Sequence, residues 1–280
     1  MNNPMKNMKT IALFLLCLLS FNTYANEVDD WHNKGSDAYD IKDYTQSFKW
    51  HKKAAEQGHA ESQLRLGFMY NDGNGVPQNH KQAVKWLTKA AEQGHAYAQY
   101  CLGVMYNAGL GVTLDYSQAF KWYYKAAEQG EVEAQSNLAS MYGAGKGVTQ
   151  SFTQSFKWCK KAAEQGHVDS QFLLGIIYLD GKGVPQNNKQ AAKWVIKAAV
   201  QGHVYAQFFL GTMFHEGKGT IQSNNKAYIW WAIAASNGSE DAIINRDLKA
   251  KELSPRALEE AQEEAAKLYE EINAISLITD

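Results

Sequence analysis

The chain has 280 residues, of which 45% are hydrophobic and 12% aromatic, and its 28 basic and 29 acidic side chains leave a net charge of −1. This apolar and aromatic content is enough for a substantial packed interior, which argues against an intrinsically disordered protein. The balanced charge argues against a nucleic-acid ligand, which would require a clustered basic face.

The first 25 residues have the pattern of a secretory signal peptide. Lys6 and Lys9 supply a positive start, Ile11 to Phe21 form a short apolar run, and Thr23 and Ala25 are small residues before a cleavage site. The run is shorter than the about 20 residues that a membrane-spanning helix needs. We therefore expect cleavage near Ala25 and a periplasmic or secreted protein without a transmembrane segment.

From residue 43 onward the chain repeats itself every 36 residues. The phrase AAEQGH or a variant of it begins at six alanines: Ala54, Ala90, Ala126, Ala162, Ala198 and Ala234. A tryptophan keeps the same spacing: Trp50, Trp86, Trp122, Trp158, Trp194 and Trp230. A period between about 20 and 50 residues is typical of a solenoid built from stacked supersecondary units.

Each copy begins with a helical segment, here named the LG helix, such as residues 60–72. Its apolar residues follow i, i+3, i+4 spacing, and the pair Leu-Gly recurs within it, with Leu138-Ala139 as the one variant. Glycine inside a helix costs about 1 kcal/mol relative to alanine. Its recurrence therefore predicts a close helix crossing that a Cβ atom would obstruct.

The second segment of each copy carries the tryptophan and is named the Trp helix. Seven residues before each tryptophan stands a side chain suited to an N-cap: Asp43, Asn79, Asp115, Ser151, Asn187 and Ser223. A glutamine three residues later in five copies predicts a capping box. The glycine of AAEQG predicts the left-handed C′ position that ends the helix, with the two alanines packed and the Glu-Gln pair facing water.

Two periodic lysine positions flank each tryptophan, as Lys85 and Lys89 flank Trp86. We expect their alkyl stems to lie over the tryptophan on a solvated outer face. The alternative is a surface for anionic lipid or polysaccharide, which the nearby acidic residues disfavour.

Histidines and paired glycines also keep the period. A histidine follows the stop glycine in four copies: His59, His95, His167 and His203. Recurrence at one turn position favours a structural role over metal binding or catalysis. The paired glycines, such as Gly73 and Gly75, connect two helices, whereas a phosphate cradle would follow a strand. We therefore expect no metal, no cofactor and no nucleotide.

These residues resemble the Sel1-like repeat family, a relative of the tetratricopeptide repeat. The family pattern A-x-A-Q-x-x-L-G-x-x-Y, then G-x-G-V, then A-x-x-W-x-x-K-A-A-x-x-G stands almost verbatim from Ala96 to Gly130. The resemblance implies an all-α, right-handed α-solenoid of helix pairs. It also implies that the LG helices line a concave surface and that the Trp helices form the outer layer.

The expected organisation has four parts. Residues 1–25 are the signal peptide, and residues 26–59 form an N-terminal capping unit that resembles a tetratricopeptide hairpin because it lacks the G-x-G loop. Residues 60–238 are Sel1-like repeats of 36 residues. Residues 239–280 form two C-terminal capping helices, the second with Ser254 as its N-cap and Pro255 at its first position.

The positions that the tetratricopeptide pattern exposes on the concave face vary strongly from copy to copy. They are enriched in aromatic residues, which are frequent anchors of protein interfaces. The predicted partner-binding residues are Tyr97, Tyr100, Asn107, Phe172, Tyr205, Phe208 and His215. The alternative for each ring is that it packs against the next repeat.

The sequence thus predicts a monomeric, non-enzymatic scaffold of the bacterial envelope that holds a protein or peptide on its concave face. One alternative is an immunity-type inhibitor of a toxin or effector in the periplasm.

A further alternative is an enzyme that binds or hydrolyses β-lactams, as some cysteine-rich secreted relatives suggest. The paired cysteines of those relatives are missing, because only Cys101 and Cys159 follow the signal peptide, and we expect them to be separate thiols. The chain also has no motif such as S-x-x-K or H-E-x-x-H that would support catalysis.

Overall fold

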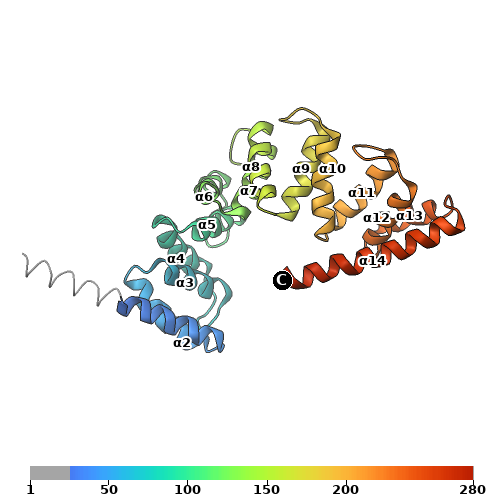
Figure 1. Ribbon diagram of the computed structural model, residues 1–280. Helices are drawn as coiled ribbons and strands as arrows, with labels where there is room; N and C mark the ends of the chain where they lie inside the picture. Colours follow the sequence, from blue (N-terminus) through green and yellow to red (C-terminus); the bar gives the residue numbers. More distant parts are fainter. Residues whose placement is uncertain (1–25, 280) are drawn as a thin grey trace, which may run out of the picture. The chain divides into compact units, whose positions relative to one another are not determined.

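The computed structural model describes residues 26–279, with side chains through residue 274, and every regular element in this part of the chain is an α-helix. The predicted signal peptide lies outside the described residues. The chain divides into two compact units, Met1–Glu131 and Val132–Asp280. In each unit the helices follow one another as sequential pairs (Figure 1), which confirms the predicted all-α solenoid.

Unit 1 begins with a helix over residues 26–40, which a short turn joins to the first Trp helix without a G-x-G loop. Its further helices are α2 (Tyr44–Glu56), α3 (Ala60–Asp72), α4 (His80–Glu92), α5 (Ala96–Ala108) and α6 (Tyr116–Glu128). Of these, α3 and α5 are LG helices, and α2, α4 and α6 are Trp helices.

Unit 2 continues the alternation and ends with two further helices. The LG helices are α7 (Val132–Ala144), α9 (Val168–Asp180) and α11 (Val204–Glu216), and the Trp helices are α8 (Phe152–Glu164), α10 (Asn188–Val200) and α12 (Asn224–Ser236). The final helices are α13 (Glu240–Ala250) and α14 (Pro255–Thr279). Ser254 accepts a hydrogen bond from the backbone N–H of Ala257 at 3.3 Å, as expected of the N-cap of α14.

The Trp helices begin at the predicted N-caps, because all six cap side chains accept a hydrogen bond from the backbone N–H three residues later. The second half of the predicted capping box was wrong. The backbone N–H of the cap donates to the end of the LG helix, as Asn79 does to the Tyr70 carbonyl at 2.7 Å. The cap therefore ties the two helices of one pair together instead of bonding its own glutamine.

The glycines of the LG helices mark close crossings, as predicted. A Cβ atom on Gly103 would lie 2.6 Å from the Tyr123 ring of the paired Trp helix. The residues at the position of Tyr123 in the six copies are all buried: His51, Leu87, Tyr123, Cys159, Val195 and Trp231. The copy with Ala139 in place of glycine has the smallest of these partners, Cys159. The crossing therefore tolerates a methyl group only where the facing side chain is small.

The paired glycines also have structural roles. Gly73 ends α3 in the left-handed conformation, and its N–H donates to the Met69 carbonyl. Gly75 has a φ of 71°, and a Cβ atom there would collide with the Tyr44 backbone at the start of α2. The first glycine of this loop therefore ends a helix, as the sequence indicated, and the second lets the loop backbone approach the backbone of the preceding Trp helix.

The Glu-Gln pair of AAEQG is exposed, as predicted, and its glutamine also reaches a buried glutamine of the neighbouring LG helix. The Gln93 side-chain amide donates to the Gln63 side-chain oxygen at 2.7 Å, and the Gln63 amide donates to the Ala55 carbonyl at 3.1 Å. Gln63 is 4% exposed. Equivalent side-chain bonds join Gln129 to Gln99, Gln165 to Gln135, Gln201 to Gln171 and Asn237 to Gln207. This relay gives a second donor to the Ala55 carbonyl in the last turn of α2, which also accepts a hydrogen bond from the Gly58 N–H at 3.0 Å.

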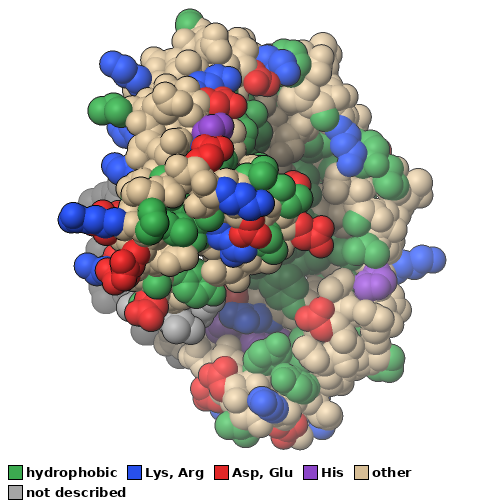
Figure 2. Space-filling view, turned by 90° about the vertical axis from the view of Figure 1, so that its right-hand side faces the viewer, with side chains coloured by type: hydrophobic (Ala, Val, Ile, Leu, Met, Phe, Trp, Pro, Cys, Tyr) green, Lys and Arg blue, Asp and Glu red, His purple; other side chains and the backbone are tan. Residues whose placement is uncertain are grey.

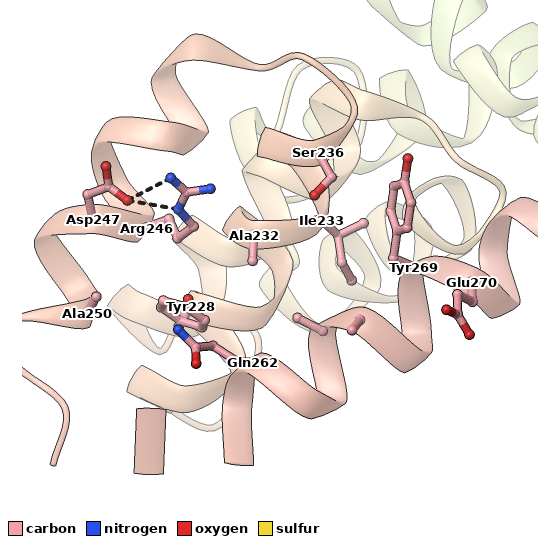
Figure 3. Close-up of a pocket in the computed structure, with 12 residues that line it drawn as sticks. Tyr228, Ala232, Ile233, Ser236, Arg246, Asp247, Ala250, Gln262, Tyr269 and Glu270 are labelled. Carbon is pink, nitrogen blue, oxygen red and sulfur yellow. Dashed lines mark hydrogen bonds and ion pairs between the residues drawn. The ribbon is translucent and has the colours of Figure 1, made fainter. Parts of the chain in front are cut away.

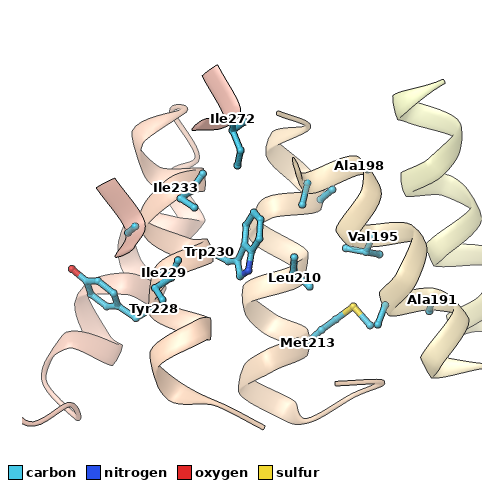
Figure 4. Close-up of a cluster of buried hydrophobic side chains, with 14 of the residues drawn as sticks. Ala191, Val195, Ala198, Leu210, Met213, Tyr228, Ile229, Trp230, Ile233 and Ile272 are labelled. Carbon is cyan, nitrogen blue, oxygen red and sulfur yellow. The ribbon is translucent and has the colours of Figure 1, made fainter. Parts of the chain in front are cut away.

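In four copies the lysine three residues after the tryptophan lies over its indole ring, with Lys89 Nζ 4.3 Å from the Trp86 centroid and Lys197 Nζ 4.4 Å from that of Trp194. Lys53 lies 3.7 Å from the Trp31 centroid and 5.8 Å from that of Trp50. The outer-face prediction is thus confirmed for this series. In α12 the lysine is replaced by Ile233, and α14 covers the outer side of the helix. Figure 4 shows Ile272 pointing into the cluster of Trp230 and Ile233.

Candidate partner-binding surface

Most of the predicted binding residues lie on the same face of their own LG helix, and this face of each helix is here named the LG face. It consists of a first position in each copy and of the residues three, seven and ten places later. The first positions are Asp29, Glu61, Tyr97, Glu133, Asp169 and Tyr205.

The recurrent histidines link the first position to the scaffold. His95 Nδ1 accepts a hydrogen bond from the Ala98 backbone N–H at 3.3 Å and so caps α5, while its Nε2 lies 2.9 Å from Glu61 Oε2. The same contact joins His59 to Asp29, His167 to Glu133 and His203 to Asp169. A neutral imidazole with its proton on Nε2 satisfies both partners. The structural role predicted for these histidines is confirmed.

The pKa directions follow from these contacts. Burial raises the pKa of Glu61, but the hydrogen bond from His95 and the charge of Arg65 outweigh it and hold the pKa below its usual range. Burial lowers the pKa of His203, although Asp169 acts in the opposite direction. A neutral His203 keeps the lone pair that caps α11.

Two copies have no histidine at the cap, and in both the facing residue is a tyrosine. Glu131 stands 34 residues after Tyr97, and Ser239 stands 34 residues after Tyr205. Tyr97 is 43% exposed and Tyr205 is 73% exposed. Part of the variation along the LG face is therefore explained by the scaffold, and the two tyrosines are the first-position residues outside the acid–histidine pairing.

In unit 1 the structure brings Tyr97 and Tyr100 together. Their rings stack with centroids 5.7 Å apart, and they extend to Phe68 on one side and to the buried Tyr123 on the other. Asn107 lies half-buried near the end of the same helix. Tyr100 is thus both a surface residue and part of the packing between copies.

In unit 2 the predicted residues divide between surface and packing. Phe172 lies 4.8 Å from the His203 ring and packs against the core of the unit. Phe208 packs against the cluster that contains Trp231. His215 is exposed, with its ring 5.7 Å from that of Trp231. The alternative of packing against the next repeat thus holds in part for Phe172 and Phe208, and partner binding by the seven residues stays a prediction.

Sequence reasoning missed two residues of this surface. Ile244 is 58% exposed and Leu248 is 54% exposed, and both lie on α13. Adding the 36-residue period to Phe208 and Thr212 leads to them. The 36-residue spacing was therefore a signal that could have found them within the predicted capping segment.

A cluster of three histidines surrounds the buried Ser62 in unit 1. The Nδ1 atoms of His59, His32 and His51 lie 3.0, 3.1 and 3.5 Å from Ser62 Oγ. Burial and the neighbouring His32 lower the pKa of His51 to about 4. Among the described residues, no group of three or more His, Cys, Asp or Glu side chains is placed to hold a metal ion.

A hollow of about 560 Å³ lies between α12, α13 and α14 (Figure 3). Ile233 and Ala265 contribute to its apolar floor, while Arg246 at its edge is paired with Asp247 at 2.7 Å. The small residues of α14 leave this space where the helix passes over α12.

Neither charge nor the thiols indicate another kind of site. Basic and acidic side chains are interspersed on the face shown in Figure 2. Cys101 and Cys159 are free and buried, as expected, and burial raises the pKa of each to about 12. Within residues 26–279 no helix is long and apolar enough to cross a bilayer.

A helical repeat scaffold is defined by stacked helix pairs that share their buried residues and differ at the residues of one exposed face. The Sel1 repeat model matches residues 30–59, 60–95, 96–131, 132–167, 168–203 and 204–239. The chain therefore belongs to the Sel1 repeat family. No curated protein matches it in sequence.

The chain is similar to several solved structures. A Sel1 repeat protein from Oxalobacter formigenes is 30% identical, with a TM-score of 0.74 over 84% of this chain and 99% of that chain. A protective antigen of uropathogenic Escherichia coli is 26% identical, with a TM-score of 0.46 over 89% and 78%. An immunity protein from Pseudomonas aeruginosa is 20% identical, with a TM-score of 0.41 over 75% and 81%.

Proposed function

We propose that the chain is a non-enzymatic scaffold of the bacterial envelope that binds a segment of another protein along the LG face. Sel1 repeats generally mediate protein interactions. For this chain we propose, in addition, that the surface is the LG face, that the ligand is a segment of another protein and that the compartment is the bacterial envelope.

The observation that carries this proposal is the apolar end of the LG face in unit 2. Tyr205 on α11 is 73% exposed, and Ile244 and Leu248, one helical turn apart on α13, are 58% and 54% exposed. Burying apolar surface stabilises a complex by about 25 cal/mol per Å², and an exposed apolar patch on a protein is typical of an interaction site.

The four periodic histidines and the two thiols, which could otherwise perform chemistry, are committed to the scaffold, which supports a non-enzymatic role. The four periodic histidines use Nδ1 as a cap acceptor. The two thiols are buried with pKa values near 12, so thiolate nucleophiles are suppressed. An active site would instead place perturbed groups together in an accessible cleft.

Binding is tested by measuring capture of a random peptide library on the immobilised chain. The double variant Ile244→Ser with Leu248→Ser should lose capture, because it removes the exposed aliphatic surface. The matched control is Ile196→Ser on the Trp helix α10, where the isoleucine is 37% exposed, and it should bind as wild type does. Equal capture by all three proteins would contradict the proposal.

Export is a separate part of the proposal. We expect the protein to be recovered from the periplasm or the medium with an N-terminus at Asn26, as N-terminal sequencing after fractionation would determine. Recovery of the uncleaved chain from the cytoplasm would contradict it. Hydrolysis of a chromogenic β-lactam by the purified protein would contradict the non-enzymatic role.

A further inference from the structure

One copy of the repeat in unit 2 has a notch on the LG face. The cavity has a volume of about 170 Å³, and it lies between the ends of α7 and α9 and the start of α8. Its lining includes Gly143 on α7, Phe152 and Ser155 on α8, and Leu173 and Ile176 on α9. Gly143 and Ile176 are both LG-face positions.

The notch exists because Gly143 has no side chain. The corresponding residues in the other copies are Asn71, Asn107, Leu179 and His215. In unit 1 the Asn71 side-chain oxygen lies 3.1 Å from His80 Nδ1, and His80 corresponds to Phe152. In the copy after the notch, Leu179 is 7% exposed and belongs to the core. The chain thus places its own side chain here at Asn71 and Leu179 and leaves the place open at Gly143.

The chemistry of the notch favours an apolar occupant. The lining residues Leu173, Ile176 and Ile177 are aliphatic, and Phe152 is 41% exposed. The one buried hydroxyl, that of Ser155, already donates to the Ala139 carbonyl at 2.8 Å. An apolar cavity of about 150 Å³ accommodates a molecule the size of benzene. One branched aliphatic side chain therefore fits here.

Polar groups surround this apolar site. Lys182 Nζ lies 3.2 Å from Asp180 Oδ2, and both side chains are largely exposed. Such a rim around an apolar centre is typical of the places where one anchor residue of a partner is held. Phe172, one helical turn before Ile176, continues the apolar surface along α9.

We propose that this notch is a specificity pocket for one aliphatic side chain of leucine-like size on the bound protein segment. The inference rests on the proposed function and adds the residue type that the partner must present. The occupant takes the place that Leu179 fills in the next copy.

The test is a double-mutant cycle with a peptide selected from a phage-displayed random library on the wild-type protein. Dissociation constants are measured for the peptide and for its single alanine variants. One aliphatic position should lose about tenfold or more in affinity on truncation, as expected for a buried branched side chain.

Gly143→Leu fills the notch from within and should weaken the parent peptide by a similar factor. It should also abolish the discrimination between the parent peptide and its alanine variant. Gly143→Ala is the matched control, because it changes helix propensity in the same direction and adds only a Cβ atom, which would lie 3.2 Å from Ser155 Oγ. Gly143→Asn, the residue present at positions 71 and 107, replaces the leucine variant if that variant fails to fold.

Two results separate the inference from the proposed function. If peptides bind but Gly143→Leu and truncation of the aliphatic residue act independently, the pocket assignment is wrong and peptide binding survives. If the wild type selects no peptide, the proposed function fails and the pocket assignment fails with it.

Discussion

Successive copies of the repeat differ at the first position of the LG face, and the difference has two forms. In four copies a carboxylate there meets the capping histidine of the next copy, as Glu61 meets His95 at 2.9 Å. In two copies the cap is Glu131 or Ser239, and the facing residue is Tyr97 or Tyr205. In the acidic copies the first-position carboxylate contacts a histidine of the scaffold, whereas in the tyrosine copies the ring is exposed to solvent. Sequence variation between copies therefore indicates a binding surface only at positions whose residues do not pair with another residue of the same chain.

The largest expected effect on stability belongs to the acid–histidine copy that starts at Asp29, where His51 and His32 join His59 around Ser62. The pKa of His51 is lowered from 6.5 to about 4 by burial and by His32. The unfolded chain therefore binds more protons between these pH values, and stability is lost as the pH falls from 6.5 to 4. A shift of this size corresponds to about 3 kcal/mol.

We expect His51→Leu to remove most of that pH dependence, since Leu87 occupies the same place in the next copy and Gly35 leaves room for it. Urea unfolding at several pH values measures the change. The exposed His215→Leu is the control and should keep the wild-type slope. The charged groups that face His51, namely Arg65, Glu61, His32 and His59, remain in both variants. An unchanged slope in His51→Leu would contradict the assignment.

A smaller effect is expected at the cap of an acid–histidine copy. His95→Ala removes the acceptor for the Ala98 N–H and should lower the free energy of unfolding by about 1–2 kcal/mol. His95→Asn retains a capping oxygen and loses only the reach to Glu61, so its loss should be less than half as large. Equal losses in the two variants, measured by urea unfolding, would show that the cap is not the dominant contribution.

The carboxylate side of the pair should contribute less again. Asp169 is 80% exposed in its side chain and lies 3.4 Å from His203 Nε2. Because His203 is neutral, the contact is a hydrogen bond to a largely exposed carboxylate, for which about 0–1 kcal/mol is expected, so Asp169→Asn should shift the midpoint of thermal unfolding only slightly at any salt concentration. A large loss would contradict this ranking.

The smallest effect on stability is expected in a tyrosine copy. Tyr205→Ala removes a ring that is 73% exposed, and it should change the free energy of unfolding by no more than about 0.5 kcal/mol. Peptide binding should nevertheless weaken, as fluorescence anisotropy with a library-selected peptide would measure. If the variant instead unfolds at a much lower temperature, Tyr205 belongs to the core and the comparison of copies fails.

The sequence allowed much of the scaffold to be predicted because its signals are local. Caps such as Asn79, stop glycines and the Leu-Gly crossing each depend on a few neighbouring residues. The glutamine relay was missed because Gln63 finds Ala55 and Gln93 only once three helices are packed. The cluster around Ser62 likewise joins histidines from separate helices.

The candidate site was less accessible to sequence reasoning. Tyr97 and Tyr205 could be placed on the LG face from the period alone, but whether Phe208 is a surface or a core residue depends on α13 packing nearby. Ile244 and Leu248 could have been found by continuing the 36-residue spacing into the segment predicted to be a C-terminal cap. The notch is formed where Gly143 has no side chain. The residues that line it come from three helices and can be identified only from the fold.

The most direct test of a partner on the LG face is site-specific photocrosslinking in cells that express the protein. Benzoylphenylalanine is placed at position 205, 248 or 196, in place of Tyr205, Leu248 or the exposed Ile196 of the Trp helix α10. Positions 205 and 248 should form the same discrete crosslinked species, and position 196 should form none. A species captured from position 196 and from neither LG-face position would contradict the account.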